Sequence, residues 1–274
     1  MKRFAITPLT SLAAAVIAMF PTGAFSVDIG TLHCNDATGV PLLNNTAVTV
    51  RGILTGTYPT STSNRVFIQD ATGGINVFGT PQMCSLARGD DIEVSGTLIH
   101  FNGLTEVAST ATVPLTITVM SSGNPEPAPI DLTPFQADHL YQADNCEPNE
   151  SSLVRVSNVY VRTATGGVPT GNYVAQTNYR LISAGPDSTT NFCTMRIVQS
   201  TNPCNTLNPI VGQPIIASCV LNVTGVDQQF DSAPPLDTGY QLTPRAPADL
   251  QFLPGCTVAV ENRTWGDVKV LYRD

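Results

Sequence analysis

The chain has 274 residues, and its 21 acidic against 13 basic side chains give a formal net charge of −8 at pH 7. Nucleic-acid-binding proteins usually carry a basic surface, so this balance argues against a strongly basic binding role. Short runs of Val, Ile, Thr, Phe and Tyr alternate with turns rich in Gly, Pro, Asn, Asp and Ser, which predicts an all-β protein.

Residues 1–26 have the three parts of a secretory signal peptide. The positive Lys2 and Arg3 precede an apolar run from Leu9 to Phe20, and small residues precede the expected cleavage after Ser26. The apolar run is shorter than the roughly 20 residues that a membrane-spanning helix needs. We therefore expect a secreted protein, extracellular or periplasmic, with no membrane span.

Residues 27–120 are predicted to form a first β-barrel module. Its strands are expected at 47–54, 66–70, 75–78, 92–98 and 101–107. Residues 66–70 and 75–78 flank two glycines and form a predicted hairpin. Gly52 lies inside the first strand, where it would allow the sharp bend that a barrel requires.

Residues 121–150 are predicted to be a linker, because four of the nine residues from Ser121 to Pro129 are proline or glycine. One short helix is expected over 133–143. Residues 151–254 repeat the order of the first module. The strands of this second module are expected at 152–159, 179–182, 194–198, 217–225 and 240–245.

Residues 255–274 are predicted to be a short helical tail. Trp265, Val268 and Leu271 recur at helical spacing, and Thr264 can cap the start of the turn. The tail either docks on the second module or serves as an export or attachment signal.

Three ordered motifs lie in the first module: Phe-Ile-Gln-Asp-x-x-Gly-Gly-Ile-x-Val at 67–77, Gly-Asp-x-Ile-x-Val-Ser-Gly-Thr at 89–97 and Phe-Asn-Gly-Leu-Thr-Glu at 101–106. From about Val48 to Val107 the chain resembles the OB-fold domain of secreted bacterial nucleases and other surface proteins. The second module resembles it more loosely. The resemblance implies two tandem OB-fold-like five-stranded barrels, whose second and third strands commonly form a ligand face. The catalytic domain of those nucleases has no counterpart in this chain.

The seven cysteines all follow the predicted signal peptide, which favours disulfides in an oxidising compartment. The expected pairs are Cys193–Cys204, Cys34–Cys84 and Cys146–Cys256. Cys219 lies inside an apolar run and is expected to be a free buried thiol. The connectivity stays open, because six cysteines allow 15 pairings.

The first hairpin carries the candidate ligand-binding residues. With Ile68, Ile75 and Val77 in the core, alternation turns the neighbouring side chains outward. The candidates are Phe67, Gln69, Asn76 and Phe78 on the hairpin, Arg51 and Arg65 beside it, and Tyr179 and Arg196 in the second module. Exposed aromatic and amide side chains can stack on bases or sugars. Alternatively, Phe67 and Phe78 pack under a loop, the linker or the other module.

Motifs that would indicate catalysis are absent from the sequence: the chain has no Gly-x-Ser-x-Gly, P-loop, dinucleotide fingerprint or His-Glu-x-x-His. His33, His100 and His139 lie in three separate segments, and Asp90-Asp91 follows a glycine in a predicted turn. We predict no enzyme activity, no metal site and no cofactor.

The sequence therefore favours a secreted, non-catalytic binding or adaptor protein with two OB-like modules, whose ligand is an oligosaccharide or a protein. One alternative is a nucleic-acid-binding accessory module of an extracellular nuclease system. Another is a structural subunit of a surface layer or filament. The expected partner is an extracellular polymer, either glycan or nucleic acid, or a cell-surface protein, and the structural alternative adds self-association.

Overall fold

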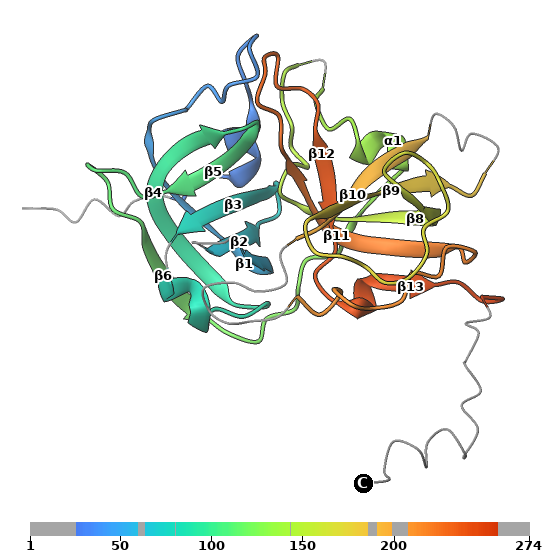
Figure 1. Cartoon of the computed structure of the whole chain (residues 1–274). Helices are drawn as coiled ribbons and strands as arrows, with labels where there is room; N and C mark the ends of the chain where they lie inside the picture. The colour runs from blue at the N-terminus through green and yellow to red at the C-terminus, as the bar shows by residue number, and fades with distance from the viewer. Residues whose placement is uncertain are drawn as a thin grey trace, which may run out of the picture.

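The computed structural model describes residues 26–59, 64–79, 81–142, 144–185, 191–198 and 208–256. Residues 1–25 of the predicted signal peptide and residues 257–274 of the predicted tail lie outside these ranges, so both remain predictions. Figure 1 shows two β-rich modules packed side by side, with the first in blue to green and the second in yellow to red. None of the helices in the described ranges has the length and hydrophobicity needed to span a bilayer.

The first module contains a closed five-stranded barrel. Its strands are β1 (Ala47–Pro59), β2 (Asn64–Gln69), β3 (Gly74–Gly79), β4 (Asp91–Phe101) and β5 (Leu104–Ala108). They pair in the order β1-β2-β3-β5-β4, and β4 pairs with β1 to close the ring. The β3–β5 pairing is parallel and the others are antiparallel. The five predicted strands are confirmed, and β6 (Thr116–Ser121), which was not predicted, adds to β4.

Alternating side chains build the core of this barrel. Val66, Ile68, Ile75 and Val77 all face inward and are fully buried, as their spacing predicted. Gly52 lies where β1 passes from its pairing with β4 to its pairing with β2. A Cβ atom there would lie 2.8 Å from the backbone of the adjacent β2 strand, so only glycine allows this close approach.

The second module is a seven-stranded sheet. Its strands are β7 (Ile130–Leu132), β8 (Leu153–Thr163), β9 (Thr177–Ser183), β10 (Phe192–Ile197), β11 (Leu221–Gln229), β12 (Tyr240–Thr243) and β13 (Leu250–Phe252). The order is β13-β11-β12-β10-β9-β8-β7, with a further pairing between β11 and β8. The β10–β12 pairing is parallel, like β3–β5 in the first barrel.

The predicted linker contains structure of its own. Ile130–Leu132 forms β7, which pairs in parallel with β8. The expected helix is shorter than 133–143: α1 covers only Pro134–Ala137, and Thr133 caps its first turn. The described residues also form three short 3-10 helices, η1 (Ile29–His33), η2 (Pro81–Ser85) and η3 (Pro247–Asp249).

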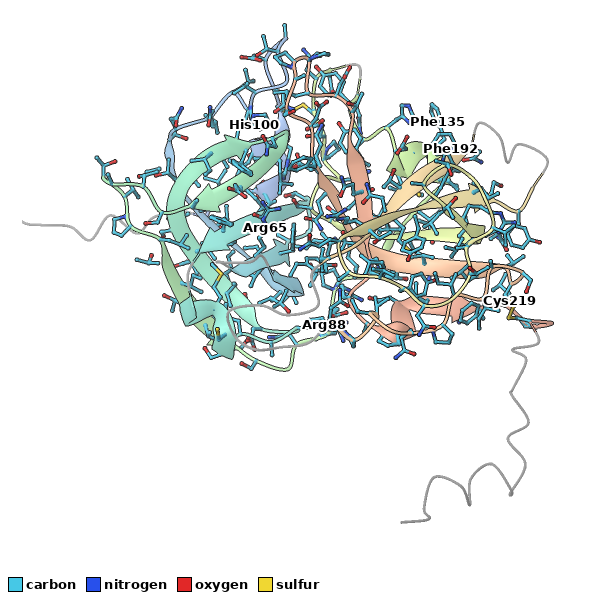
Figure 2. The ribbon with its side chains drawn as sticks, in the orientation of Figure 1. Arg65, Arg88, His100, Phe135, Phe192 and Cys219 are labelled. Atoms are coloured by element: carbon cyan, nitrogen blue, oxygen red, sulfur yellow. A yellow bond between two sulfur atoms is a disulfide. The ribbon has the colours of Figure 1, made fainter. Side chains whose placement is uncertain are left out.

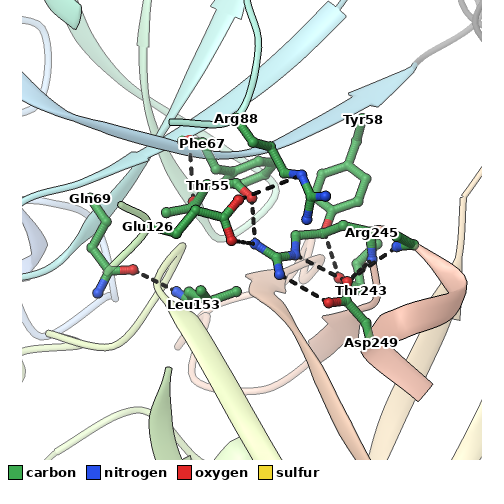
Figure 3. A network of polar contacts seen from close by, with 11 residues as sticks. Thr55, Tyr58, Phe67, Gln69, Arg88, Glu126, Leu153, Thr243, Arg245 and Asp249 are labelled. Atoms are coloured by element: carbon green, nitrogen blue, oxygen red, sulfur yellow. Dashed lines mark hydrogen bonds and ion pairs between the residues drawn. The ribbon is translucent and has the colours of Figure 1, made fainter. Parts of the chain in front are cut away.

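A polar network joins the two modules (Figure 3). The Arg245 guanidinium, which follows β12, donates to the backbone oxygen of Thr55 in β1 at 2.8 Å. Its other nitrogens bind both carboxylate oxygens of Asp249. The side-chain oxygen of Gln69 on β2 accepts a hydrogen bond from the backbone of Leu153 on β8, at 2.8 Å. At the contact, hydrogen-bond donors of one module are therefore paired with acceptors of the other.

Two disulfides differ from the predicted pairing. Cys34 is bonded to Cys146 and Cys219 to Cys256, so the Cys34–Cys84 and Cys146–Cys256 pairs are wrong and Cys219 is not a free thiol. Cys34 and Cys146 face each other across an isolated antiparallel bridge that joins the N-terminal segment to the linker. Disulfides of this kind fit an oxidising compartment.

Cys193 is a free thiol, so the predicted Cys193–Cys204 pair is also wrong. On β10, Cys193 shares the inward face with Met195 and Ile197, and this alternation turns its sulfur into the apolar core. Cys84 is disulfide-bonded. Cys204 lies outside the described residues.

Candidate functional site

The predicted ligand face of the first hairpin is covered by the second module. Alternation placed Phe67 and Asn76 on the correct side of their strands, away from the first core, yet both are fully buried. Gln69 is 6% exposed and bonded to the second module. The exposed stacking platform expected here is therefore wrong, because Tyr58 and Val226 pack against Phe67 from outside the barrel.

The charged neighbours of that hairpin are engaged within the first module. The Arg65 guanidinium carbon lies 5.7 Å from the centre of the half-buried Phe78 ring. Burial lowers the pKa of Arg65, and the nearby Glu106 carboxylate acts in the opposite direction. Arg51 forms a two-pronged ion pair with Asp91 at 2.9 and 2.6 Å. Arg51 is therefore neutralised by an ion pair, whereas Arg65 is largely buried and has Glu106 as its charged neighbour.

In the second module, the structure separates the two predicted residues. Tyr179 is 5% exposed and packs edge-on against Tyr173 in the core, so it does not share the outward surface of Arg196. Arg196 is partly exposed and donates to the Asn178 side chain at 2.9 Å. The reason is alternation on β9: Tyr179 has the same orientation as the core residue Leu181, whereas Arg180 between them points outward.

Arg196 belongs to a larger set on the outer face of β8, β9 and β10. In the strand register, Arg180 lies opposite Arg162 on one side and Thr194 on the other, while Arg196 lies opposite Asn178. All of the outward side chains are partly exposed. We call this surface the arginine face, and its members are Tyr160, Arg162, Asn178, Arg180, Phe192 and Arg196.

Aromatic rings hold two of these arginines in place. The Arg180 guanidinium carbon lies 4.0 Å from the centre of the Phe192 ring, and that of Arg162 lies 4.9 Å from the centre of the Tyr160 ring. Such cation–π contacts stabilise the pair and orient the guanidinium group. Arg162 also donates to the backbone oxygens of Val161 and Ala217, both at 2.8 Å. The charges are thus arranged before any ligand arrives.

The arginine face is also where positive charge is not neutralised. Four other arginines are ion-paired: Arg51 with Asp91, Arg88 with Glu126, Arg155 with Asp131, and Arg245 with Asp249 and Glu126. Among the described residues, no carboxylate lies within ion-pair distance of Arg162, Arg180 or Arg196. Of the four described arginines that have no ion pair, three therefore lie on this surface. The fourth, Arg65, is largely buried near Glu106, and the Asp138 carboxyl group lies near Arg180.

Helix α1 borders this face. The Phe135 ring is 52% exposed and stacks on the His139 ring, with centroids 4.1 Å apart. The backbone N–H of Phe135 donates to the Asn191 side chain at 2.8 Å, which fixes α1 beside the start of β10. Figure 2 shows Phe135 and Phe192 close together on the second module. Burial raises the pKa of Asp138 next to this stack.

A shallow groove of about 490 Å³ lies at the other end of the arginine face. The β8–β9 loop forms most of its wall, and Asn178, which binds Arg196, lines its floor. The lining side chains carry no charge and consist of threonines, asparagines, aliphatic groups and Tyr179. The groove can therefore accept an uncharged planar or sugar group beside the arginines.

The residues weighed for catalysis are dispersed. His33 is buried beside Glu150, His100 lies on β4 and His139 stacks on α1. Asp90 accepts a hydrogen bond from the Ala87 backbone, which confirms its role in the turn. In the part of the chain that is described, no group of three His, Cys, Asp or Glu side chains is arranged to hold a metal ion.

Comparison with known proteins gives one sequence likeness. The chain is 26% identical over 213 residues to the endonuclease YhcR of Bacillus subtilis strain 168. The alignment covers 76% of this chain but only 15% of the endonuclease. No protein-family model matches. A solved structure of a replication protein A heterotrimer bound to ssDNA aligns with 80% of this chain and 68% of its own at 10% identity, with a TM-score of 0.26, too weak to carry an argument.

Proposed function

We propose that this protein is a secreted, non-catalytic module that binds single-stranded nucleic acid on the arginine face. One observation carries the proposal: three of the four described arginines that have no ion pair share one sheet surface, and two of them stack on aromatic rings. Arginine binds phosphate through paired hydrogen bonds, and an aromatic ring offers a surface to a base.

The strand order supports the same location. We propose that the second sheet is a second OB-like barrel, since β8-β9-β10-β12-β11 repeats the order and the parallel pairing of the first barrel. In OB-folds the second and third strands form the ligand face. In the second module these are β9 and β10, which carry Arg180, Phe192 and Arg196. The sequence relative is an endonuclease, which favours nucleic acid over glycan as the polymer.

The charge balance favours a single strand with modest affinity. The bases of a single strand are free to stack on Tyr160 and Phe192, whereas those of a duplex are stacked on each other. The remainder of the protein is acidic and repels a highly charged duplex. Three arginines neutralise few phosphates, so we expect the binding to be weak and only mildly dependent on salt.

Fluorescence anisotropy with a labelled oligo(dT) of about a dozen nucleotides, a length within the site sizes of OB-folds, tests this function. The logarithm of the binding constant should fall with the logarithm of the salt concentration, with a slope of about −2 for three phosphate contacts on a single strand. Arg180→Ala with Arg196→Ala should flatten the slope to about −0.7. Phe192→Ala should weaken binding roughly 5- to 150-fold, the equivalent of one stacked base.

The matched control is Arg155→Ala, an exposed arginine that is already paired with Asp131 and lies off the arginine face. It should leave both affinity and salt slope unchanged. Absence of oligo(dT) binding at low salt would contradict the proposal. Binding of a neutral oligosaccharide with no salt dependence would instead support the adaptor function that the sequence favoured.

A further inference from the structure

The segment that joins the modules is pinned between them at Cys146–Ser152. The disulfide from Cys146 to Cys34 ties it to the N-terminal segment, and the backbone N–H of Glu147 donates to the His33 carbonyl at 3.0 Å. A few residues later, the backbone N–H of Ser151 donates to the Asp227 carbonyl on β11. The Ser152 hydroxyl accepts from the backbone of Gly74 on β3 at 2.8 Å. This segment is therefore bonded to both modules at once.

The buried His33 ring faces two hydrogen-bond acceptors. Its Nε2 atom lies 2.7 Å from the carbonyl oxygen of Gly74, which can only accept, so Nε2 carries a proton. Its Nδ1 atom lies 3.3 Å from a carboxyl oxygen of Glu150. That contact also needs a proton, held either on the imidazole or on the carboxyl group. The pair thus holds one proton more than a neutral histidine and a carboxylate would.

A second carboxyl group lies beside this pair. Glu147 is 1% exposed and Glu150 is fully buried. One oxygen of Glu147 accepts from the Asn35 amide at 3.0 Å and the other from the Tyr240 hydroxyl on β12, while Glu150 accepts from the Thr105 backbone on β5 at 2.8 Å. Among the described residues no lysine or arginine is ion-paired with either carboxyl group. Two adjacent buried carboxylates without a cation would repel each other strongly.

The surroundings add more acid than base. The titratable and charged groups that face this set from the elements packed around it are Tyr141, Tyr240, Glu106 with Arg65, and Asp227 with Asp138. Asp227 is fully buried, and neither of its carboxyl oxygens has a hydrogen-bond partner in the described structure. Arg65 is the only one of these groups that carries a permanent positive charge, and it faces Glu106.

We propose that the buried, hydrogen-bonded set of His33, Glu147 and Glu150 locks the joining segment to both modules, and that loss of the Glu147 proton at alkaline pH loosens the module junction. At acidic and neutral pH the Glu147 carboxyl group keeps its proton and adds no negative charge beside Glu150. When that proton leaves, uncompensated negative charge remains in a site that water does not reach. The Cys34–Cys146 bond keeps the chain segments attached, so the junction opens without coming apart.

The direction of the pH effect follows from the carboxyl groups. Burial, and next the neighbouring Glu150, raise the pKa of Glu147 from 4.5 to about 9. Burial raises the pKa of Glu106 to about 7. Because the folded protein binds these protons more tightly than the unfolded chain, their contribution to stability is full below about pH 4.5 and is lost as the pH rises to about 9.

Thermal unfolding between pH 5 and pH 10 tests the site in the full-length protein. The wild-type Tm should fall steadily over this range. Glu147→Gln should remove about half of the fall, because glutamine resembles the protonated acid but cannot ionise. Glu93→Gln, a partly exposed carboxyl group on β4, is the matched control and should follow the wild type. Hydrogen exchange should show the Glu147, Glu150 and Ser151 amides losing protection at high pH in the wild type but not in Glu147→Gln.

Proton counting gives an answer even if Glu147→Gln folds poorly. Wild-type protein that is unfolded at pH 7 in unbuffered denaturant should release protons, because Glu147 is protonated in the folded state and ionised in the unfolded chain at this pH. A wild-type Tm that is flat from pH 5 to pH 9, or the absence of proton release, would overturn the proposal. A Glu147→Gln variant with the full wild-type pH slope would also overturn it. None of these measurements involves nucleic acid, so they succeed or fail independently of the proposed binding function.

Discussion

The ring of Tyr58 packs edge-on against the ring of Phe67 with centroids 5.3 Å apart, on the outside of the first barrel. Val226 of the second module completes this contact. The Tyr58 hydroxyl donates to the Thr243 carbonyl of the second module at 2.5 Å. The outer surface of the first hairpin is therefore an internal surface of the whole protein, and its aromatic residues contribute to stability.

Replacing Phe67 by alanine should destabilise the protein by about 3–5 kcal/mol, because it removes a fully buried ring and leaves a cavity between the modules. Urea unfolding monitored by circular dichroism measures the change in the free energy of unfolding. Phe135→Ala is the matched control: its ring is 52% exposed, and the change should stay within about 0.5 kcal/mol. Equal effects of the two substitutions would show that Phe67 is not buried in solution.

Arg245→Ala should cost about 3–5 kcal/mol of stability, because it leaves the buried Asp249 carboxylate without its partner and removes a hydrogen bond to Thr55. Arg155→Ala breaks an ion pair whose side chains are 39% and 65% exposed, so its cost should be at most about 1 kcal/mol. Chemical denaturation of both variants at low and high salt measures the loss of unfolding free energy in each and distinguishes the two losses. A cost below that of Arg155→Ala would contradict the assigned role of Arg245 in the junction.

Cys193 should resist alkylation in the native protein and react once the protein is unfolded. Its side chain is 1% exposed, and burial raises the pKa of the thiol well above its ordinary value, so almost no reactive thiolate is present. Iodoacetamide labelling followed by mass spectrometry, with and without denaturant but without reductant, measures this. Non-reducing peptide mapping of the same sample should recover the Cys34–Cys146 and Cys219–Cys256 peptides. Recovery of a disulfide-linked Cys193 peptide would show that the structure has the wrong pairing.

The sequence determined the local structure well. Alternation of Ile68, Ile75 and Val77 with polar or aromatic neighbours placed the hairpin strands and identified the inward side of each, because a strand that buries one face repeats every two residues. The glycines at the hairpin turn and at Gly52 marked where the chain must turn or approach another strand. On β9 the same alternation would have selected Arg180 in place of Tyr179, because Tyr179 and Leu181 point to the same side.

Only the tertiary structure decided which outward faces meet solvent. Phe67 and Arg180 are both outward residues on the second or third strand of their modules, yet the first is covered by the neighbouring module and the second is partly exposed. Periodicity indicates which side of a strand faces the core of its own module, and it contains no information about whether a second module covers the other side. The same limit applies to Cys34–Cys146 and to the pairing of Arg245 with Asp249 and Thr55, because contacts between distant segments depend on how the modules dock, and docking depends on shape and charge over the whole surface.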